Sequence, residues 1–355
     1  MKCDSKPVNI IFIVISHCPL DQSKRGVRAK FNIKKEDKMK RTKLFKTFTV
    51  VGLIFLGVLS LSSSAFGWGA ATHAYIDSHL NEKDKLNAIY GGLVPDMFQY
   101  VFDSPCLSVE LNDQTHHSFM PVWDEASALP AVPPRALAYG FVSHNDTWGA
   151  DSTAHHAGIT FGQSEGYIIA KAYELKTILE QVPDYQALQI PDPVSLEISH
   201  ELIEDGVDIL VKRLDPTIGR KLMMSAIGRS KALPVLLSEA YAADLSSCAG
   251  ISYLEASRLI ATTEAEFRKN MVAYGALLTQ NETTAVQILS QQVAQLAIGF
   301  LAANGIELPP GTDLTPLIEF AITTSMEICA DDFGSEIRAT ITFVKGNLIS
   351  HGVSY

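Results

Sequence analysis

The stretch VSLEISHELIEDGVDILVKRL, residues 194–214, decides the fold class. Its apolar residues recur at spacings of three and four, which places them along one side of an α-helix. Alternation typical of strands is scarce, and its best example is RATITFV at residues 338–344. We therefore expect an all-α protein, with further long helices at residues 164–182, 230–245, 253–279 and 283–303.

The domain organisation follows from where these helical patterns stop. Pro and Gly clusters such as VPDYQALQIPDP and NGIELPPGTD separate them, and neither an internal repeat nor a low-complexity linker is visible. We expect one globular multi-helix domain over residues 68–355, with a site core at 68–215 and additional helices at 216–355. Residues 283–306 are uncharged, but their Gln and Ser residues favour a packed helix over a membrane span.

The beginning of the chain has the layout of a secretory signal peptide. The basic segment KMKRTKLFKT, residues 38–47, precedes the apolar FTVVGLIFLGVLSLSSSAFG. Ala65 and Gly67 suit the positions before a cleavage site, so residues 1–67 are expected to be a leader, with Met39 an alternative start. The mature protein would be secreted or periplasmic and would begin at Trp68. An uncleaved N-terminal anchor is the alternative.

The charge changes when residues 1–67 are set aside. Sixteen Lys and Arg then face 35 Asp and Glu, a formal charge of −19 compared with −10 for the whole chain. A surface this acidic argues against a stable complex with a nucleic-acid backbone. The three remaining cysteines, Cys106, Cys248 and Cys329, allow at most one disulfide.

Nine histidines follow residue 67, and eight of them lie between positions 73 and 200. His200 and Glu204 are four residues apart on an expected helix, so they share a face and can hold one zinc ion. Such a pair alone is usually a solvated helix surface. The segment GFVSHNDTWGADSTAHHAG is denser, because within thirteen positions it holds His144, Asp146, Asp151, His155 and His156.

Two shorter elements precede this segment: GGLVPD, which ends in Asp96, and DQTHHSF, which contains His116 and His117. Each alone is typical of a turn or loop. The order of all the elements, from Trp68 and His73 to His200 and Glu204, resembles the zinc-dependent phospholipase C family. It also resembles the related three-zinc, single-strand-specific nucleases of fungi and plants. The resemblance covers roughly residues 68–215.

The resemblance implies three Zn²⁺ ions. One is held by His73, a bridging Asp, and the α-amino group and carbonyl oxygen of Trp68, which would explain a Trp directly after the cleavage site. The second takes the same Asp with Asp96, His144, and His117 or His116. The third takes His155 or His156 with His200 and Glu204. Asp96 occupies the place of a residue proposed in the family as ligand or general base, and is the expected catalytic residue.

The bridging Asp departs from the family pattern. The family usually places it four residues after the first His of the cluster, where this chain has Trp148. Asp151 is favoured because its spacing to His155 is the short one of the family, and Asp146, expected to face solvent, is the alternative. On an unbroken helix Asp151 would lie about 10 Å along the axis from His144. An Asp151 bridge therefore needs a bulge near Gly149.

The resemblance implies phosphodiester hydrolysis by a zinc-activated water. Neither a Gly-x-Ser-x-Gly elbow nor a Gly-rich phosphate loop points to another nucleophile. We expect a phospholipase C-like hydrolase acting on a phospholipid or another phosphodiester, with transient contact to a membrane surface. The alternatives are a single-strand nuclease of the same superfamily and an exported zinc-binding protein without catalysis.

Overall fold

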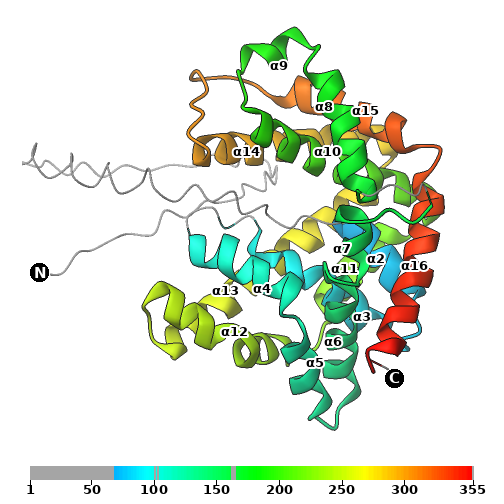
Figure 1. The fold of residues 1–355 in the computed structure, drawn as a ribbon, viewed down its shortest axis with the longest axis vertical. Helices are drawn as coiled ribbons and strands as arrows, with labels where there is room; N and C mark the ends of the chain where they lie inside the picture. Colours follow the sequence, from blue (N-terminus) through cyan, green and yellow to red (C-terminus); the bar gives the residue numbers. More distant parts are fainter. Residues whose placement is uncertain (1–67, 100, 102–103, 161–164, 354–355) are drawn as a thin grey trace, which may run out of the picture. The chain divides into compact units, whose positions relative to one another are not determined.

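The computed structural model describes residues 68–99, 101, 104–160 and 165–353. Within these ranges every regular element is a helix, which confirms the all-α class (Figure 1). The expected leader and its cleavage site lie outside the described residues. In chain order the elements are α2 (Ala70–His79), α3 (Lys85–Leu93), the 3₁₀-helix η1 (Val94–Phe98), the π-helix η2 (Cys106–Leu111), α4 (Asn112–His117), α5 (Met120–Ser127), α6 (Val132–His144), α7 (Ala150–His155), α8 (Tyr167–Leu179), α9 (Pro183–Ala187), α10 (Asp192–Leu214), α11 (Ile218–Gly228), α12 (Leu233–Ala249), α13 (Tyr253–Leu278), α14 (Glu282–Ala303), α15 (Thr315–Cys329) and α16 (Phe333–Ser350).

The five long segments with helical periodicity are all helices, namely α8, α10, α12, α13 and α14. The strand-like segment RATITFV is also helical, within α16. Its alternating letters are misleading because the residues that α16 buries recur every three or four positions. These include Ile337, Ile341, Val344 and Leu348.

Helix α10 lies at the centre of the described unit, in contact with α2, α8, α11, α14, α15 and α16. A helix surrounded by other helices must be buried on most of its circumference. Accordingly α10 buries polar as well as apolar side chains, including His200, Glu204 and Asp208. The central helix therefore carries chemistry-bearing residues into the interior.

Helices α3 and α6 approach each other closely because both carry glycine where they cross. A Cβ atom on Gly91 would lie 2.0 Å from the carbonyl oxygen of Leu137, and one on Gly140 would lie 1.9 Å from that of Ala88. Any side chain at either position would push the helices apart. This close approach brings the end of α3 beside His144, the last residue of α6.

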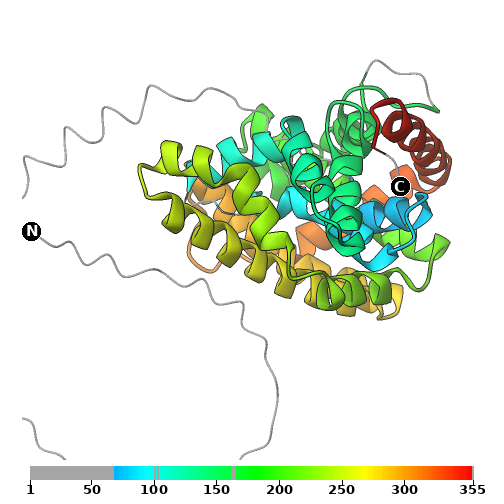
Figure 2. The same ribbon diagram turned by 90° about the horizontal axis from the view of Figure 1, so that it is seen from below.

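Several of the later helices pack against earlier ones. Helices α12 and α13 pack side by side, and α16 packs against α2, α6 and α7 (Figures 1 and 2). A disulfide joins Cys106 in η2 to Cys248 in α12, while Cys329 is a buried free thiol. This pairing is the single disulfide that three cysteines allow.

Helix α14 is the one described helix long and apolar enough to cross a membrane by length and composition. Core helices of soluble proteins can be equally long and apolar. It packs against α10, α13 and α15, and 33% of its most apolar window is buried. Its Gln residues 287, 291, 292 and 295 are all exposed.

Candidate metal centre

A break between two helices brings His144 and Asp151 together. Helix α6 ends at His144 and α7 begins at Ala150. In the turn between them, the side-chain Oδ1 of Asn145 accepts hydrogen bonds from the backbone N–H groups of Thr147, Trp148 and Gly149. The separation of about 10 Å between His144 and Asp151 that an unbroken helix would impose is therefore absent. Oδ2 of Asp151 lies 2.9 Å from Nε2 of His144.

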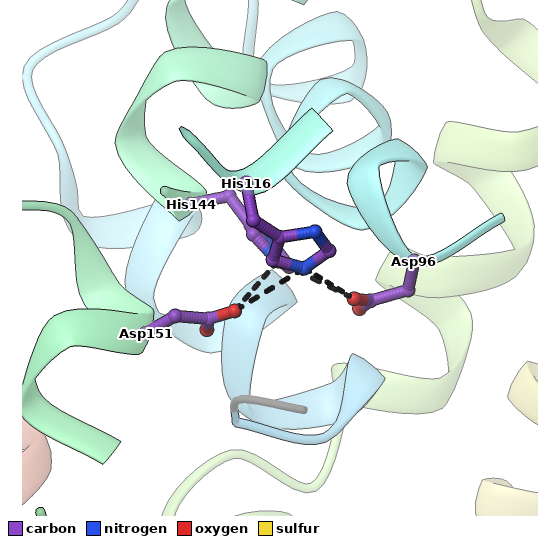
Figure 3. A group of neighbouring side chains, drawn as sticks. All are labelled: Asp96, His116, His144 and Asp151. Atoms are coloured by element: carbon purple, nitrogen blue, oxygen red, sulfur yellow. Dashed lines mark hydrogen bonds and ion pairs between the residues drawn. The ribbon is translucent and has the colours of Figure 1, made fainter. Parts of the chain in front are cut away.

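His144 and Asp151 belong to a set of four side chains, the central group, which also contains Asp96 from η1 and His116 from α4 (Figure 3). Nε2 of His116 and Nε2 of His144 are 3.1 Å apart. Oδ1 of Asp96 lies 3.2 Å and 3.4 Å from these two nitrogens. Oδ2 of Asp151 lies 3.6 Å from His116 and 2.9 Å from His144.

The spacing within the central group suits a tetrahedral cation. Five of the six distances between the four ligand atoms run from 2.9 to 3.6 Å. A tetrahedral zinc ion with bonds of about 2.0–2.1 Å would separate its ligand atoms by about 3.3–3.4 Å. Two imidazole nitrogens and two carboxylate oxygens are also ligand types that zinc accepts. The described residues therefore fit one ion at this point.

Backbone carbonyl groups aim the two imidazoles of the central group. Nδ1 of His144 lies 2.8 Å from the carbonyl oxygen of Gly92, and Nδ1 of His116 lies 2.6 Å from that of Asn112. With the proton donated from Nδ1, Nε2 presents its lone pair to the centre of the group. This is the usual arrangement of a metal-binding histidine.

The segment Trp68–His73, here called the N-terminal arm, approaches the other face of Asp151. The backbone nitrogen of Trp68 lies 3.3 Å from Oδ1 of Asp151, and Nε2 of His73 lies 2.9 Å from the same oxygen. The buried indole of Trp68 donates to the carbonyl oxygen of Ala150 and to Thr153 Oγ1, one residue before and two residues after Asp151. One oxygen of Asp151 thus faces the arm and the other faces the central group.

His155, His200 and Glu204 form a second set, here called the α10 group. Nε2 of His200 lies 2.8 Å from Oε1 of Glu204, and the rings of His155 and His200 meet edge to face with centroids 5.3 Å apart. His155 reaches them from the end of α7. Its Nε2 is buried and has no hydrogen-bond partner among the described residues, as suits a nitrogen that would bind a cation.

Asp146 does not face solvent, contrary to expectation. Its side chain is 5% exposed, and Oδ1 lies 2.8 Å from Nδ1 of His155. The turn after α6 directs the Asp146 side chain toward the end of α7, while its backbone N–H donates to the carbonyl oxygen of His116. Asp146 therefore orients His155, as carboxylates commonly orient metal-binding histidines.

The structure also distinguishes the members of the two histidine pairs. His116 is fully buried in the central group, while the side chain of His117 is 44% exposed and lies beside Asp113. His155 belongs to the α10 group, while the side chain of His156 is 61% exposed and contacts Asp146. Consecutive residues on a helix point about 100° apart, so one member of each pair turns inward and the other outward.

The electrostatics of the central group favour a buried positive charge. Burial would lower the pKa of His144, but the carboxylates of Asp151 and Asp96 raise it well above its usual range. Burial would raise the pKa of Asp151, yet His144 and His73 hold it well below its usual range. Two ionised carboxylates in the interior require compensating positive charge, which a divalent cation would provide.

In the α10 group, burial shifts the pKa values of His200 and Glu204 toward their neutral forms. Burial, with a further contribution from His155, lowers the pKa of His200 well below its usual range. Burial, followed by the charge of Glu201, raises the pKa of Glu204 well above its usual range. Histidine binds a metal in its neutral form, and a nearby cation would return Glu204 to its ionised form.

Helix α16 supports α7 and the segment after it from the far end of the chain. Glu336 is fully buried and accepts hydrogen bonds from the backbone N–H groups of Ile159 and Thr160, just after His155. Thr340 Oγ1 lies 2.8 Å from Thr153 Oγ1 on α7. The pattern of the sequence suggested no such role for residues 216–355, because these contacts span more than 170 positions.

The chain matches no protein-family model, no curated protein and no solved structure. Its functional assignment therefore depends on the residues that the fold brings together.

Proposed function

We propose that this chain is an exported zinc-dependent phosphoric diester hydrolase of the phospholipase C type, with the helical fold of that family. Three Zn²⁺ ions would be held by the N-terminal arm with Asp151, by the central group and by the α10 group. The substrate would be a phospholipid or another phosphodiester, reached in transient contact with a membrane surface.

The observation that carries the proposal is the position of Asp151. This fully buried carboxylate presents Oδ1 to Trp68 N and His73, and Oδ2 to His144 and His116. A carboxylate between two sets of nitrogen donors suits a bridge between two cations. Structural zinc sites are usually closed tetrahedra with one ion each, so a shared carboxylate favours catalysis over a purely structural role.

Asp96 is the member of the central group that a substrate can approach. Its side chain is 18% exposed, whereas those of His116, His144 and Asp151 are fully buried. Although burial would raise the pKa of Asp96, His144 and His116 hold it below its usual range, so the carboxylate is ionised at neutral pH. It can thus bind metal and accept a hydrogen bond from an attacking water.

When bound, zinc lowers the pKa of water and polarises a phosphoryl oxygen. The residues of this chain hold the ligands in fixed positions and keep the site buried. His116 and His144 are fixed by backbone carbonyls, His155 is fixed by Asp146, and the fully buried Asp151 has no exposed surface. Preorganised groups of this kind require little rearrangement during the reaction.

The test combines metal analysis with two substrates. Protein recovered after export and loaded with zinc is analysed for metal content and assayed on phosphatidylcholine vesicles and on single-stranded DNA. Zinc with lipid hydrolysis supports the proposal, and zinc with DNA hydrolysis supports the nuclease alternative. Zinc without hydrolysis of either substrate points to a non-catalytic zinc binder. A folded protein that takes up no zinc contradicts the proposal.

A further inference from the structure

Asp208 lies on α10 four residues after Glu204, so His200, Glu204 and Asp208 follow one another along one face of the helix. The first two belong to the α10 group. Asp208 is 1% exposed and points instead to the beginning of α2. The spacing extends the pattern His-x-x-x-Glu by a further x-x-x-Asp.

The carboxylate of Asp208 takes the place of a helix cap for α2. Oδ2 accepts a hydrogen bond of 2.7 Å from Ala71 N–H, and Oδ1 accepts one of 2.8 Å from Thr72 N–H. These are the second and third residues of the helix, whose N–H groups have no partner within it. The residue at the N-cap, Gly69, has no side chain to satisfy them.

Two hydroxyl groups complete the surroundings of Asp208. Thr72 Oγ1 donates to Oδ1 at 2.8 Å, and the Tyr274 hydroxyl on α13 donates to Oδ2 at 2.8 Å. A Cβ atom on Gly69 would lie 2.7 Å from Cγ of Asp208. Asp208 therefore occupies the space where a capping side chain at position 69 would lie.

The first turn of α2 forms most of the N-terminal arm. His73 N–H donates to the carbonyl oxygen of Gly69 at 3.0 Å, so His73 lies one turn from the capped end. Its ring stacks on His144 with centroids 4.0 Å apart, and its Nε2 faces Asp151. A rotation or fraying of this first turn would move His73 and Trp68 away from Asp151.

We propose that Asp208 is a positioning residue that holds Trp68 and His73 against Asp151 by capping α2 from the central helix. This inference builds on the proposed function, in which the arm and Asp151 bind one zinc ion. The hydrogen bonds of the Asp208 carboxylate within the described residues go to Ala71, Thr72 and Tyr274, none of which is a proposed ligand. Its effect is carried by the backbone of residues 69–73, and it ties the arm to the helix that carries His200 and Glu204.

The test uses two substitutions that disturb the contact from opposite sides. Asp208→Asn replaces an acceptor oxygen with an N–H donor facing backbone N–H groups, and Gly69→Ala adds a Cβ against the carboxylate. Each is expected to weaken binding of one of three zinc ions about 10–100-fold, as loss of a supporting contact does, and to leave the zinc of the α10 group in place. Amide hydrogen exchange at Ala71 and Thr72 should rise in both variants.

Two controls separate positioning from general stability. Glu264→Gln alters another fully buried carboxylate, which binds Tyr90 and Arg229, and should lower the melting temperature without changing zinc content. Tyr274→Phe removes one of the four hydrogen bonds and should give a smaller effect of the same kind as Asp208→Asn. If Asp208→Asn does not fold, Gly69→Ala and Tyr274→Phe decide the question.

The inference is overturned if folded variants at positions 69 and 208 retain all three zinc ions at wild-type affinity and wild-type exchange rates. Failure of the proposed function has a different result, namely a wild-type protein that binds no zinc. In that case the exchange rates of Ala71 and Thr72, measured without metal, still show whether Asp208 holds the arm.

Discussion

Oδ1 of Asp146 lies 2.8 Å from Nδ1 of His155, and both side chains are buried. The bond fixes the His155 ring so that Nε2 faces His200 and Glu204. His155 Nδ1 donates to the carboxylate, and the same contact contributes to a pKa of Asp146 below its usual range, despite burial. A carboxylate expected to lie on the surface is thus part of the support of the α10 group.

Replacing Asp146 with Asn should weaken zinc binding at the α10 group by about 10–100-fold, the usual cost of losing a carboxylate behind a metal-binding histidine. The central group should keep its ion, because the Asp146 side chain contacts His155, His156 and His117, and the one contact with a central-group member is from its backbone N–H to the carbonyl oxygen of His116, which the substitution retains. Zinc titration measures the affinity of the α10 group, and elemental analysis measures how many ions the protein retains. Unchanged affinity at the α10 group would show that the contact with His155 has no bearing on metal binding.

Asp151→Asn should have the larger effect. If Asp151 bridges two ions, its loss releases metal from the arm and from the central group, leaves the zinc of the α10 group and lowers diester hydrolysis at least about 100-fold. The amide has one acceptor oxygen where the carboxylate has two, so it cannot serve both sides. A variant that retains three zinc ions would contradict the bridge.

The two adjacent histidine pairs offer matched controls. His116→Ala and His155→Ala should each cost one zinc ion, whereas His117→Ala and His156→Ala should retain all three. Truncating the buried member of a pair costs more stability than truncating the exposed one, so zinc is counted only on variants that circular dichroism shows to be folded. Loss of metal in the exposed members alone would assign the ligands the other way round.

The exported protein should begin at Trp68, because a free α-amino group there would lie beside Asp151. N-terminal sequencing measures the start directly. Adding a single residue before Trp68 replaces the amine with an amide and should cost the zinc of the arm without unfolding the helices, as circular dichroism would show. A stable start several residues upstream would contradict both the cleavage site and the role of Trp68.

The stability of the protein should also depend on pH through Asp77. Burial raises the pKa of this carboxyl to about 8, partly offset by a hydrogen bond from Ser143, and the unfolded value is close to 3.8. A raised folded pKa contributes stability that is complete below the unfolded value and is lost as pH rises through the folded value. Between these limits the loss approaches about 1.4 kcal/mol per pH unit.

Asp77→Asn removes this titration. Denaturant unfolding of both proteins, at saturating zinc and at several pH values from 5.5 to about 8.5, should show wild-type stability decreasing relative to the variant as pH rises. Other titrating groups are common to both proteins and cancel in the difference. A difference that stays constant across this range would show that Asp77 does not take up a proton on folding.

The sequence by itself determined the all-α class and the positions of the long helices, because hydrophobic periodicity is local and survives without tertiary information. It also indicated most of the residues that now lie together, since His, Asp and Glu gather between positions 73 and 204. RATITFV, the best strand-like alternation in the sequence, is helical because its seven residues belong to a helix of eighteen that buries one face. In a segment of seven residues, the periodicity of the whole helix decides which side chains are buried.

Only the tertiary structure decided which of two neighbouring residues turns inward. His116 and His117, like His155 and His156, differ by about 100° of helix rotation, and that rotation is set by how α4 and α7 pack. The choice of Asp151 depends on the turn at Asn145, which ends one helix and starts the next at a new angle. The roles of Asp146, Asp208 and Glu336 depend on contacts between distant segments, which no local pattern contains.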